Sequence, residues 1–472
     1  MTDVVLVKME DPMHHQLYPP FSLLYPASAL LKEGYSVKII HEKGTKENID
    51  QLRELVIRKN PILVGFSSLT GSPLLFSLKA SEEISKIGVP IAWGGIHATI
   101  LPEITLREKS IDFVVVGEGE QTIVELVKAL ENGGNFGEIR GLGYKKDTRL
   151  KFNPQREFIT DLDDYELPWN LVKLERYFQE KWGCKKVLPI NTSRGCPHRC
   201  GFCYNLLVHK RKWRGHSSEY VLEQIEELKK HGIDGIIFSE DEFFINKKRA
   251  LDIVKNIDLS WGTEIRADYI SEKFIDELKD NCEELFIGAE SGSDRVLEIM
   301  QKDLTVAQIE EAIKICKNAG ISVGVYFMIG IPGETKEDMK RTLEFMYHLY
   351  EKYDVKLDGP KVYTPYPGTP LFESAVKYGF TQPNSSVSWA TEVGRFKCNL
   401  PWIKESDRGV LENLFYLVQL AQMKNPLVRP LQKVEEFRWR NGIFKFWPEV
   451  KFAKFLSKYP NLVGFFLKYL EG

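Results

Sequence analysis

Strand-like and helix-like segments alternate along most of this chain, and this alternation restricts the folds that it can adopt. Over residues 1 to about 130, short runs rich in Val, Ile and Leu recur between amphipathic segments, with Gly or Pro at the junctions. Because parallel strands need a crossover between them, the pattern predicts a doubly wound parallel α/β sheet. We expect this domain at 1–135, followed by a linker at 136–187 with a hairpin that turns at 146–148.

A second series of six strand-like runs begins near residue 188 and continues to about residue 375. Helical patterns separate these runs, and Gly ends several of the helices as a C-cap would. Six strand–helix units predict a second α/β domain at 188–375, a partial or full (β/α) barrel whose chemistry lies at the carboxyl ends of its strands. We expect residues 376–472 to form a C-terminal helical domain.

The composition excludes several classes of protein. With 43% hydrophobic and 28% charged residues, the chain of 472 residues has the composition of a globular protein. A net charge of -2 argues against a nucleic-acid partner, because phosphate binding needs a basic excess. No run approaches the roughly 18 apolar residues of a membrane span, and no signal peptide is expected. Seven cysteines, three of them clustered, fit a reducing compartment, so we expect a cytoplasmic protein.

The clustered cysteines are Cys196, Cys200 and Cys203, in C-x3-C-x2-C spacing after the first strand of the second series. Thiolates this close on one loop can bind a single soft metal centre. If the metal is zinc, a histidine would complete the tetrahedron; the candidates are His198, His209 and His216. An iron–sulfur cluster held by three cysteines would instead leave one iron open to a ligand that is not protein. Cys316 lies in an amphipathic helical pattern, which favours a buried hydrophobic role.

The cysteine spacing, with Phe202 before the last cysteine, resembles the cluster loop of the radical S-adenosylmethionine (SAM) superfamily. In that superfamily the open iron of a 4Fe-4S cluster chelates SAM. Electron transfer then cleaves SAM to methionine and a 5'-deoxyadenosyl radical, which abstracts hydrogen from the substrate. Phe202 is therefore expected beside SAM.

The resemblance also implies SAM contacts farther along the chain. Glu240 and Asp241 would receive the amino group, and their alternative role is a helix N-cap. Arg266 would bind the carboxylate bidentately, or form an ordinary salt bridge. Glu290 and Ser291 would reach the ribose, with a strand-to-helix cap as the alternative. Two glycines of a turn, Gly330 and Gly333, would let adenine approach the backbone.

Four segments of the N-terminal half, "PPFSLLYPASALLKEGYSVKII", "GFSSLTG", "WGGIHAT" and "DFVVVGEGEQTIVELVKAL", resemble the cobalamin-binding domain that precedes the barrel in one branch of the superfamily. The resemblance covers residues 1 to about 375 in order. It implies cobalamin contacts at strand ends, where turn chemistry is the alternative: Ser67, Ser68, Thr70, Gly94, Gly95, Gly117 and Gly119. The D-x-H-x-x-G sequence is absent, because Ile39 stands where Asp would precede His41, so we expect cobalamin without a histidine ligand.

The resemblance implies an enzyme that methylates an unactivated carbon of a small-molecule or lipid substrate, with flavodoxin or ferredoxin as the reducing partner. Cyclisation, ring rearrangement or carbon–carbon coupling without methyl transfer is the alternative within the branch. A non-enzymatic metal or corrinoid sensor is the alternative outside it. A tRNA methylthiotransferase would carry further N-terminal cysteines, whereas the first cysteine here is Cys184. The basic, aromatic segment 431–472 predicts either a helical cap on the barrel or peripheral membrane contact.

Overall fold

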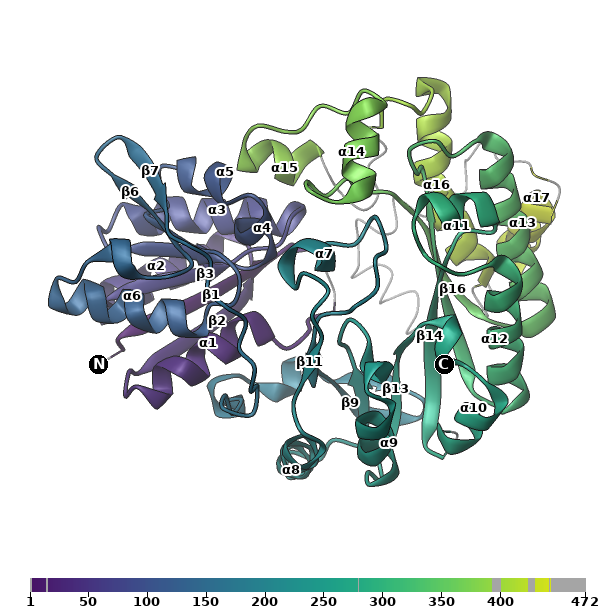
Figure 1. The fold of residues 1–472 in the computed structure, drawn as a ribbon, viewed down its shortest axis with the longest axis horizontal. Coiled ribbons are helices and arrows are strands. Elements are labelled where there is room, and N and C mark those ends of the chain that lie inside the picture. Colours follow the sequence, from purple (N-terminus) through teal and green to yellow (C-terminus); the bar gives the residue numbers. More distant parts are fainter. Residues whose placement is uncertain are drawn as a thin grey trace. The chain divides into compact units, whose positions relative to one another are not determined.

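The computed structural model describes residues 2–13, 16–278, 280–392, 400–422, 429–440 and 442 (Figure 1). These residues form two compact units. Unit 1 consists of the described residues within 1–197, 204–236 and 382–394, and unit 2 of those within 198–203, 237–381 and 395–472.

The first sheet of unit 1 is the predicted doubly wound parallel sheet. Its strand order is β2-β1-β3-β4-β5-β6-β7, in which β1 to β5 are parallel. The order reverses direction between β1 and β3, and ligands of such sheets bind beyond the carboxyl ends at this point. The strands are β1 (Val4–Glu10), β2 (Val37–Lys43), β3 (Leu63–Ser67), β4 (Ile91–Gly94), β5 (Phe113–Val115), β6 (Leu142–Lys146) and β7 (Arg149–Phe152).

Helices cover this sheet because the apolar side of each crossover packs on the strands. Helix α1 contacts α6, and α2 contacts α3 (Figure 1). The antiparallel strands β6 and β7 form the predicted hairpin, with Asp147 at a φ of 56° in its turn. The helices are α1 (Phe21–Lys32), α2 (Lys46–Lys59), α3 (Ser72–Ser85), α4 (Ile96–Ile100), α5 (Pro102–Arg107) and α6 (Glu120–Asn132).

The rest of unit 1 lies before and after the cysteine loop. Its strands are β8 (Gln179–Lys181), β9 (Cys184–Ile190), β10 (Ser193–Arg194) and β11 (Arg214–Gly215), and its helices are α7 (Asn205–Val208), α8 (Ser218–Lys229) and α15 (Ser386–Glu392). Strands β10 and β11 pair antiparallel, so the residues just before the loop are held as a short ribbon. Helix α15 packs against α3.

The second sheet has the order β16-β15-β14-β13-β12-β9-β8, and β13 to β16 are parallel. Its edge strands in the described chain, β16 and β8, are not paired with each other, so the sheet is the partial form of the predicted barrel (Figure 1). Thr305 and Thr335 begin α12 and α13 with capping boxes. The strands are β12 (Gly235–Phe238), β13 (Ser260–Ile265), β14 (Cys282–Glu290), β15 (Ser322–Ile329) and β16 (Lys356–Val362).

Helices of unit 2 follow these strands and continue beyond them. They are α9 (Lys247–Lys255), α10 (Glu272–Leu278), α11 (Asp294–Ile299), α12 (Val306–Asn318), α13 (Lys336–Tyr353), α14 (Pro370–Lys377), α16 (Glu405–Gln422) and α17 (Arg429–Arg440). Buried Trp439 of α17 donates its indole N–H to the carbonyl of Leu343 on α13 (2.9 Å). The start of the basic C-terminal segment therefore packs as a helix, whereas 443–472 lie outside the described residues. Among the helices described, none is long and apolar enough to cross a membrane.

Candidate functional site

The three cysteines lie on a loop whose backbone is held by neighbouring elements. Gly201 donates its N–H to the carbonyl of Met300 (2.7 Å) and accepts from the N–H of Leu371 (3.0 Å). The three cysteines are half-buried. In the described part of the chain no three His, Cys, Asp or Glu side chains already form a metal-binding group. The donor set itself, three cysteine thiols within eight residues, fits an iron–sulfur cluster.

The histidines that zinc would require have other contacts. His216 is buried, with Nε2 3.0 Å from Tyr25 Oη and Nδ1 2.9 Å from Asp163 Oδ1. His198 directs Nε2 at a tyrosine hydroxyl (3.0 Å), and His209 Nδ1 lies 3.4 Å from an arginine guanidinium. Binding zinc through either nitrogen of His216 would break the hydrogen bond that this nitrogen makes, so the contacts favour a site made of three thiols.

Two buried cations lie close to Cys200. Arg266 is 7% exposed, pairs with Asp268 through two nitrogens (3.0 and 3.3 Å), and places Nη1 3.6 Å from Cys200 Sγ. Lys302 is 6% exposed, and its Nζ lies 2.9 Å from Glu290 Oε1. Burial lowers the pKa of Lys302, but the charges of Glu290 and Cys200 outweigh burial and raise it. The salt-bridge alternative for Arg266 is thus observed, and its contact with SAM stays a prediction.

The acidic segment after β12 is ordered by its third acid, which sequence reasoning missed. Glu242 is 2% exposed and accepts N–H bonds from Phe244 and Arg266, both 3.1 Å. Burial raises the pKa of Glu242 to about 8, although both hydrogen bonds lower it. Glu242 is the N-cap of the short helix that follows. The N-cap role that was the alternative for Glu240 and Asp241 is therefore filled by Glu242. Their contact with the SAM amino group stays a prediction.

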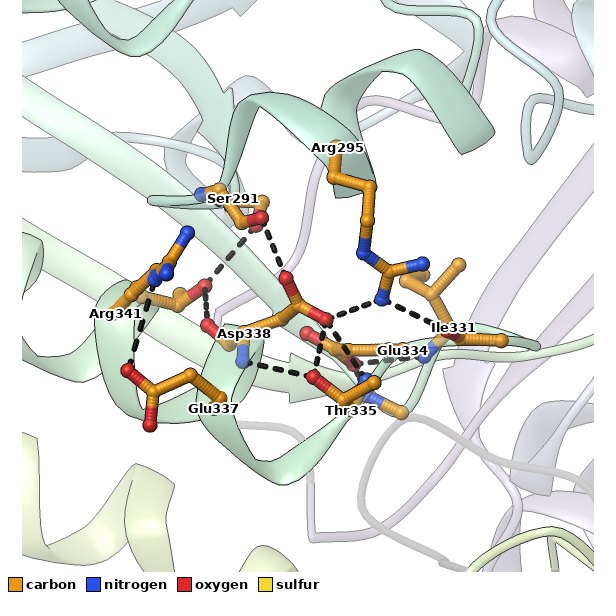
Figure 2. Close-up of polar contacts among 12 residues, drawn as sticks. Ser291, Arg295, Ile331, Glu334, Thr335, Glu337, Asp338 and Arg341 are labelled. Atoms are coloured by element: carbon orange, nitrogen blue, oxygen red, sulfur yellow. Dashed lines mark hydrogen bonds and ion pairs between the residues drawn. The ribbon is translucent and has the colours of Figure 1, made fainter.

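The end of β14 is fixed to α13 by a polar network. Ser291 is fully buried, and its Oγ lies 3.0 Å from Thr342 Oγ1. Figure 2 shows Arg295 and Thr335 pointing toward Asp338, whose carboxylate also accepts a hydrogen bond from Ser293 Oγ (2.7 Å). Ser291 therefore serves this network. Glu290 forms an ion pair with Lys302. The contacts of Ser291 and Glu290 with the ribose of SAM stay predictions.

Gly330 and Gly333 have φ values of 81° and 86°, which favour glycine. A Cβ at Gly330 would lie 2.9 Å from Leu400 Cδ1, and one at Gly333 would lie 3.2 Å from the hydroxyl oxygen of Tyr378. The Glu334 carboxylate accepts from the N–H groups of Gly330 (2.6 Å) and Ile331 (3.0 Å). These contacts explain both glycines as a turn, and the adenine contact stays a prediction.

The predicted cobalamin hydroxyls lie at the carboxyl end of β3. Ser67 donates to Ser22 Oγ (2.8 Å) and Ser68 to the carbonyl of Gly94 (3.1 Å), so each keeps only acceptor capacity for a ligand. Thr70 Oγ1 lies 3.0 Å from Nδ1 of His97, a fully buried residue that sequence reasoning missed. His97 Nε2 has no hydrogen-bond partner among the described residues, and burial lowers the pKa of His97 to about 4. An orphaned polar atom beside these hydroxyls fits a ligand with polar groups.

The glycines at this edge divide into two kinds. Gly95 has a φ of 89°, and a Cβ there would lie 2.7 Å from the Ser68 carbonyl, so it allows α4 to approach β3. Gly117 has a φ of 85°, and a Cβ added there would meet no atom within 4 Å, so its backbone is open to a ligand. A Cβ added at Gly94 or Gly119 would make only ordinary contacts, with side chains at 3.4 Å or more and with a carbonyl at 3.9 Å. Cobalamin contacts at these residues stay predictions.

His41 does not offer a nitrogen for cobalt. Its Nε2 lies 3.1 Å from Glu10 Oε1, and its Nδ1 lies 3.1 Å from Tyr177 Oη. His41 is 2% exposed. Both ring nitrogens are therefore used inside unit 1, in keeping with the expectation that this histidine is not a ligand.

Arg194, two residues before Cys196, forms ion pairs with two acids that follow β5 of the first sheet. Its Nη1 lies 2.9 Å from Glu118 Oε1, and its Nη2 lies 2.7 Å from Glu120 Oε1 without hydrogen-bond alignment. The guanidinium lies 4.0 Å from the ring centre of Tyr25, and Arg214 also pairs with Glu118. Glu118 lies between Gly117 and Gly119, so one ion-pair cluster joins the predicted cobalamin edge to the segment before Cys196. The residue types gave no signal of this pairing.

Comparison with known proteins identifies the family. The radical SAM superfamily model matches residues 190–346, and the B12 binding domain model matches 15–127. An uncharacterized methyltransferase of Pyrococcus horikoshii is 35% identical over 370 residues, which are 76% of this chain and 78% of that protein. The chain belongs to the radical SAM superfamily. It is an enzyme of the branch with an N-terminal cobalamin-binding domain, and the predicted cofactors, a 4Fe-4S cluster, SAM and cobalamin, are confirmed.

Other similar proteins have lower sequence identity to this chain. The anaerobic magnesium-protoporphyrin IX monomethyl ester cyclase of Cereibacter sphaeroides is 29% identical over 401 residues, 78% of this chain and 63% of that protein. The radical SAM methyltransferase TsrM of Kitasatospora setae, solved with tryptophan and a SAM analogue, has a TM-score of 0.68 at 17% identity. The match covers 93% of this chain and 98% of TsrM, so the two share the fold.

Proposed function

We propose that this radical SAM enzyme methylates an unactivated carbon of a small-molecule or lipid substrate. One observation carries the proposal: Arg194, two residues before Cys196, pairs with Glu118 and Glu120, next to glycines that we predict to contact cobalamin. A methyl donor and a radical generator must serve the same substrate, and this ion-pair cluster joins the predicted cobalamin edge to the segment that leads into the cysteine loop. The Pyrococcus horikoshii relative, named as a methyltransferase, supports the same reaction.

The residues of the chain divide the work of holding the cofactors. Cys196, Cys200 and Cys203 would ligate the cluster, and Phe202 would lie beside SAM. Glu240, Asp241, Arg266, Glu290 and Ser291 would hold the polar groups of SAM, and Gly330 and Gly333 its adenine. When bound, these cofactors would supply hydrogen abstraction from the substrate, which consumes one molecule of SAM, and methyl donation, which consumes a second. The expected by-products are therefore 5'-deoxyadenosine and S-adenosylhomocysteine.

Anaerobic reconstitution with iron, sulfide and hydroxocobalamin tests this proposal. Metal and corrinoid are counted, and both by-products are measured after addition of SAM and dithionite. We expect the four irons of one cluster, one corrinoid and both by-products. A triple variant with Cys196→Ala, Cys200→Ala and Cys203→Ala should lose the iron and both by-products. Cys184→Ala is the matched control, because Cys184 is also half-buried but lies outside the loop.

Cyclisation or coupling without methyl transfer is the second candidate, and the 29% identity with the cyclase of Cereibacter sphaeroides favours it. The two reactions differ in one by-product. If protein that holds the cluster and corrinoid yields 5'-deoxyadenosine without S-adenosylhomocysteine, the result would favour this second reaction over methylation. Zinc in place of iron, with no cleavage of SAM, would contradict both.

The setting of the reaction belongs to the same proposal. The reductant would be flavodoxin or ferredoxin, and the enzyme would work in the cytoplasm, where the cysteines of the loop would stay reduced. Peripheral membrane contact through 431–472 would suit a lipid substrate. Copurification with anionic vesicles, compared between the full chain and a chain ending at residue 442, tests that contact.

A further inference from the structure

A buried ion pair between Lys302 and Glu290 lies beside the cysteine loop, and Lys302 has no role in the reaction as proposed above. Lys302 Nζ is 2.9 Å from Glu290 Oε1, and the two residues are 6% and 9% exposed. A Cβ at Gly288 would lie 2.6 Å from Glu290 Oε1 and 2.9 Å from Lys302 Nζ. The bare backbone of Gly288 thus makes room for the pair.

The ammonium of Lys302 faces the loop as well as Glu290. Its Nζ lies 6.0 Å from the ring centre of Phe202, and its charge interacts with Cys200. Arg266 adds a second cation, with Nη1 3.6 Å from Cys200 Sγ. The Nη2 of the same guanidinium donates to the carbonyl of Lys302 (2.9 Å), so the two cations are held together.

Charges at these positions act on any redox centre that Cys200 binds. Adding an electron to an iron–sulfur cluster increases its negative charge, so a nearby cation favours the reduced form and an anion opposes it. Burial lets these charges act with little screening by water. Hydrogen bonds to a ligand sulfur and net charge are the levers by which a protein sets the potential of a cluster.

We propose that Lys302 and Arg266 raise the reduction potential of the cluster through Cys200, and that Glu290 opposes Lys302 to set its value. Lys302 and Glu290 are thus positioning residues that adjust how readily the cluster accepts the electron needed to cleave SAM. This inference rests on the cluster site of the proposed function.

The test is a redox titration of the reconstituted protein without SAM, followed by the EPR signal of the reduced cluster. Glu290→Gln removes the anion and should shift the midpoint potential to a more positive value, because that anion then no longer opposes the cations beside the cluster. Adding Lys302→Met to Glu290→Gln then removes the cation and should shift the potential back to a more negative value. A role in stability alone predicts no such opposite pair of shifts.

Arg199→Gln is the matched control for charge. Arg199 immediately precedes Cys200, but its side chain is 57% exposed and pairs with Asp303 at the surface. Water screens this charge, so the midpoint potential should stay at the wild-type value.

Asp268→Asn provides a second variant in case Glu290→Gln does not fold. It removes the partly exposed partner of Arg266, whose guanidinium cannot lose its proton, so the potential should again become more positive. Unchanged potentials in variants that retain their iron, or shifts of one sign throughout, would overturn the inference. Wild-type protein that binds no iron would instead defeat the proposed function itself.

Discussion

Replacing Arg194 with alanine should destabilise unit 1 strongly. The Arg194 side chain is 12% exposed, and it pairs with Glu118 and Glu120, whose side chains are 9% and 3% exposed. In Arg194→Ala, Glu118 keeps Arg214 as a partner, whereas Glu120 loses the cation beside it. The variant therefore leaves one buried carboxylate without that cation.

The magnitude follows from this single uncompensated charge. Removing one partner of a buried ion pair costs about 3–5 kcal/mol. The guanidinium also lies 4.0 Å from the ring centre of Tyr25, and such a contact contributes about 0.5–2 kcal/mol. Because Glu118 remains paired, only one ion-pair loss counts, and together with the ring contact we expect a total loss of about 3.5–7 kcal/mol. Arg194→Lys keeps a charge but cannot pair with both carboxylates equally well, so its loss should be smaller.

Urea unfolding of the apoprotein, kept reduced and followed by tryptophan fluorescence, measures this loss. Arg199→Ala is the control, since its ion pair is exposed, and its unfolding midpoint should match that of the wild type. If Arg194→Ala unfolded at the same urea concentration as Arg199→Ala, the buried ion-pair cluster would contribute nothing to the stability of unit 1, and the reasoning would be refuted.

Three further changes have expected outcomes. Burial lowers the pKa of His97 to about 4 from 6.5, so the unfolded protein binds the proton at a higher pH than the folded protein does. As the pH falls from 6.5 to 4, about 3 kcal/mol of stability is therefore lost. His97→Gln should lack this loss when urea midpoints are measured across that range. Iodoacetamide should label the loop cysteines of the native apoprotein but not buried Cys282 or Cys316. Burial raises the pKa of both thiols, that of Cys316 to about 12, so neither forms the reactive thiolate. Peptide mass spectrometry would reveal any label at those two sites. Gly195→Ala should reduce iron binding on reconstitution, because a Cβ there would lie 2.2 Å from the Lys212 carbonyl; iron at the wild-type level would show that the loop adapts.

The sequence predicted the elements of the fold well because their signals are local. Strands such as β3 and β15 appear as apolar runs between helical patterns, and the turn at Asp147 has the residue types of a hairpin. The three loop cysteines were found by spacing alone. These features depend on residues that are close together in the chain.

The charged contacts around the site could not be predicted, because they depend on distant residues. Lys302, Glu242 and Arg194 have the residue types of surface positions, and only the fold buries them beside a partner. Glu118 and Arg194 are 76 residues apart, and neither residue type shows that they pair. His97 likewise has no sequence signal that distinguishes a buried imidazole from an exposed one.

The central claim, methyl transfer through a bound corrinoid, can be tested without knowing the substrate. Reconstituted enzyme is incubated under reducing conditions with SAM that carries a trideuterated methyl group, and the corrinoid is extracted and analysed by mass spectrometry. We expect a corrinoid with the trideuteromethyl group and an equal amount of S-adenosylhomocysteine. A corrinoid that stays bound but never acquires the label, while 5'-deoxyadenosine accumulates, would contradict the claim.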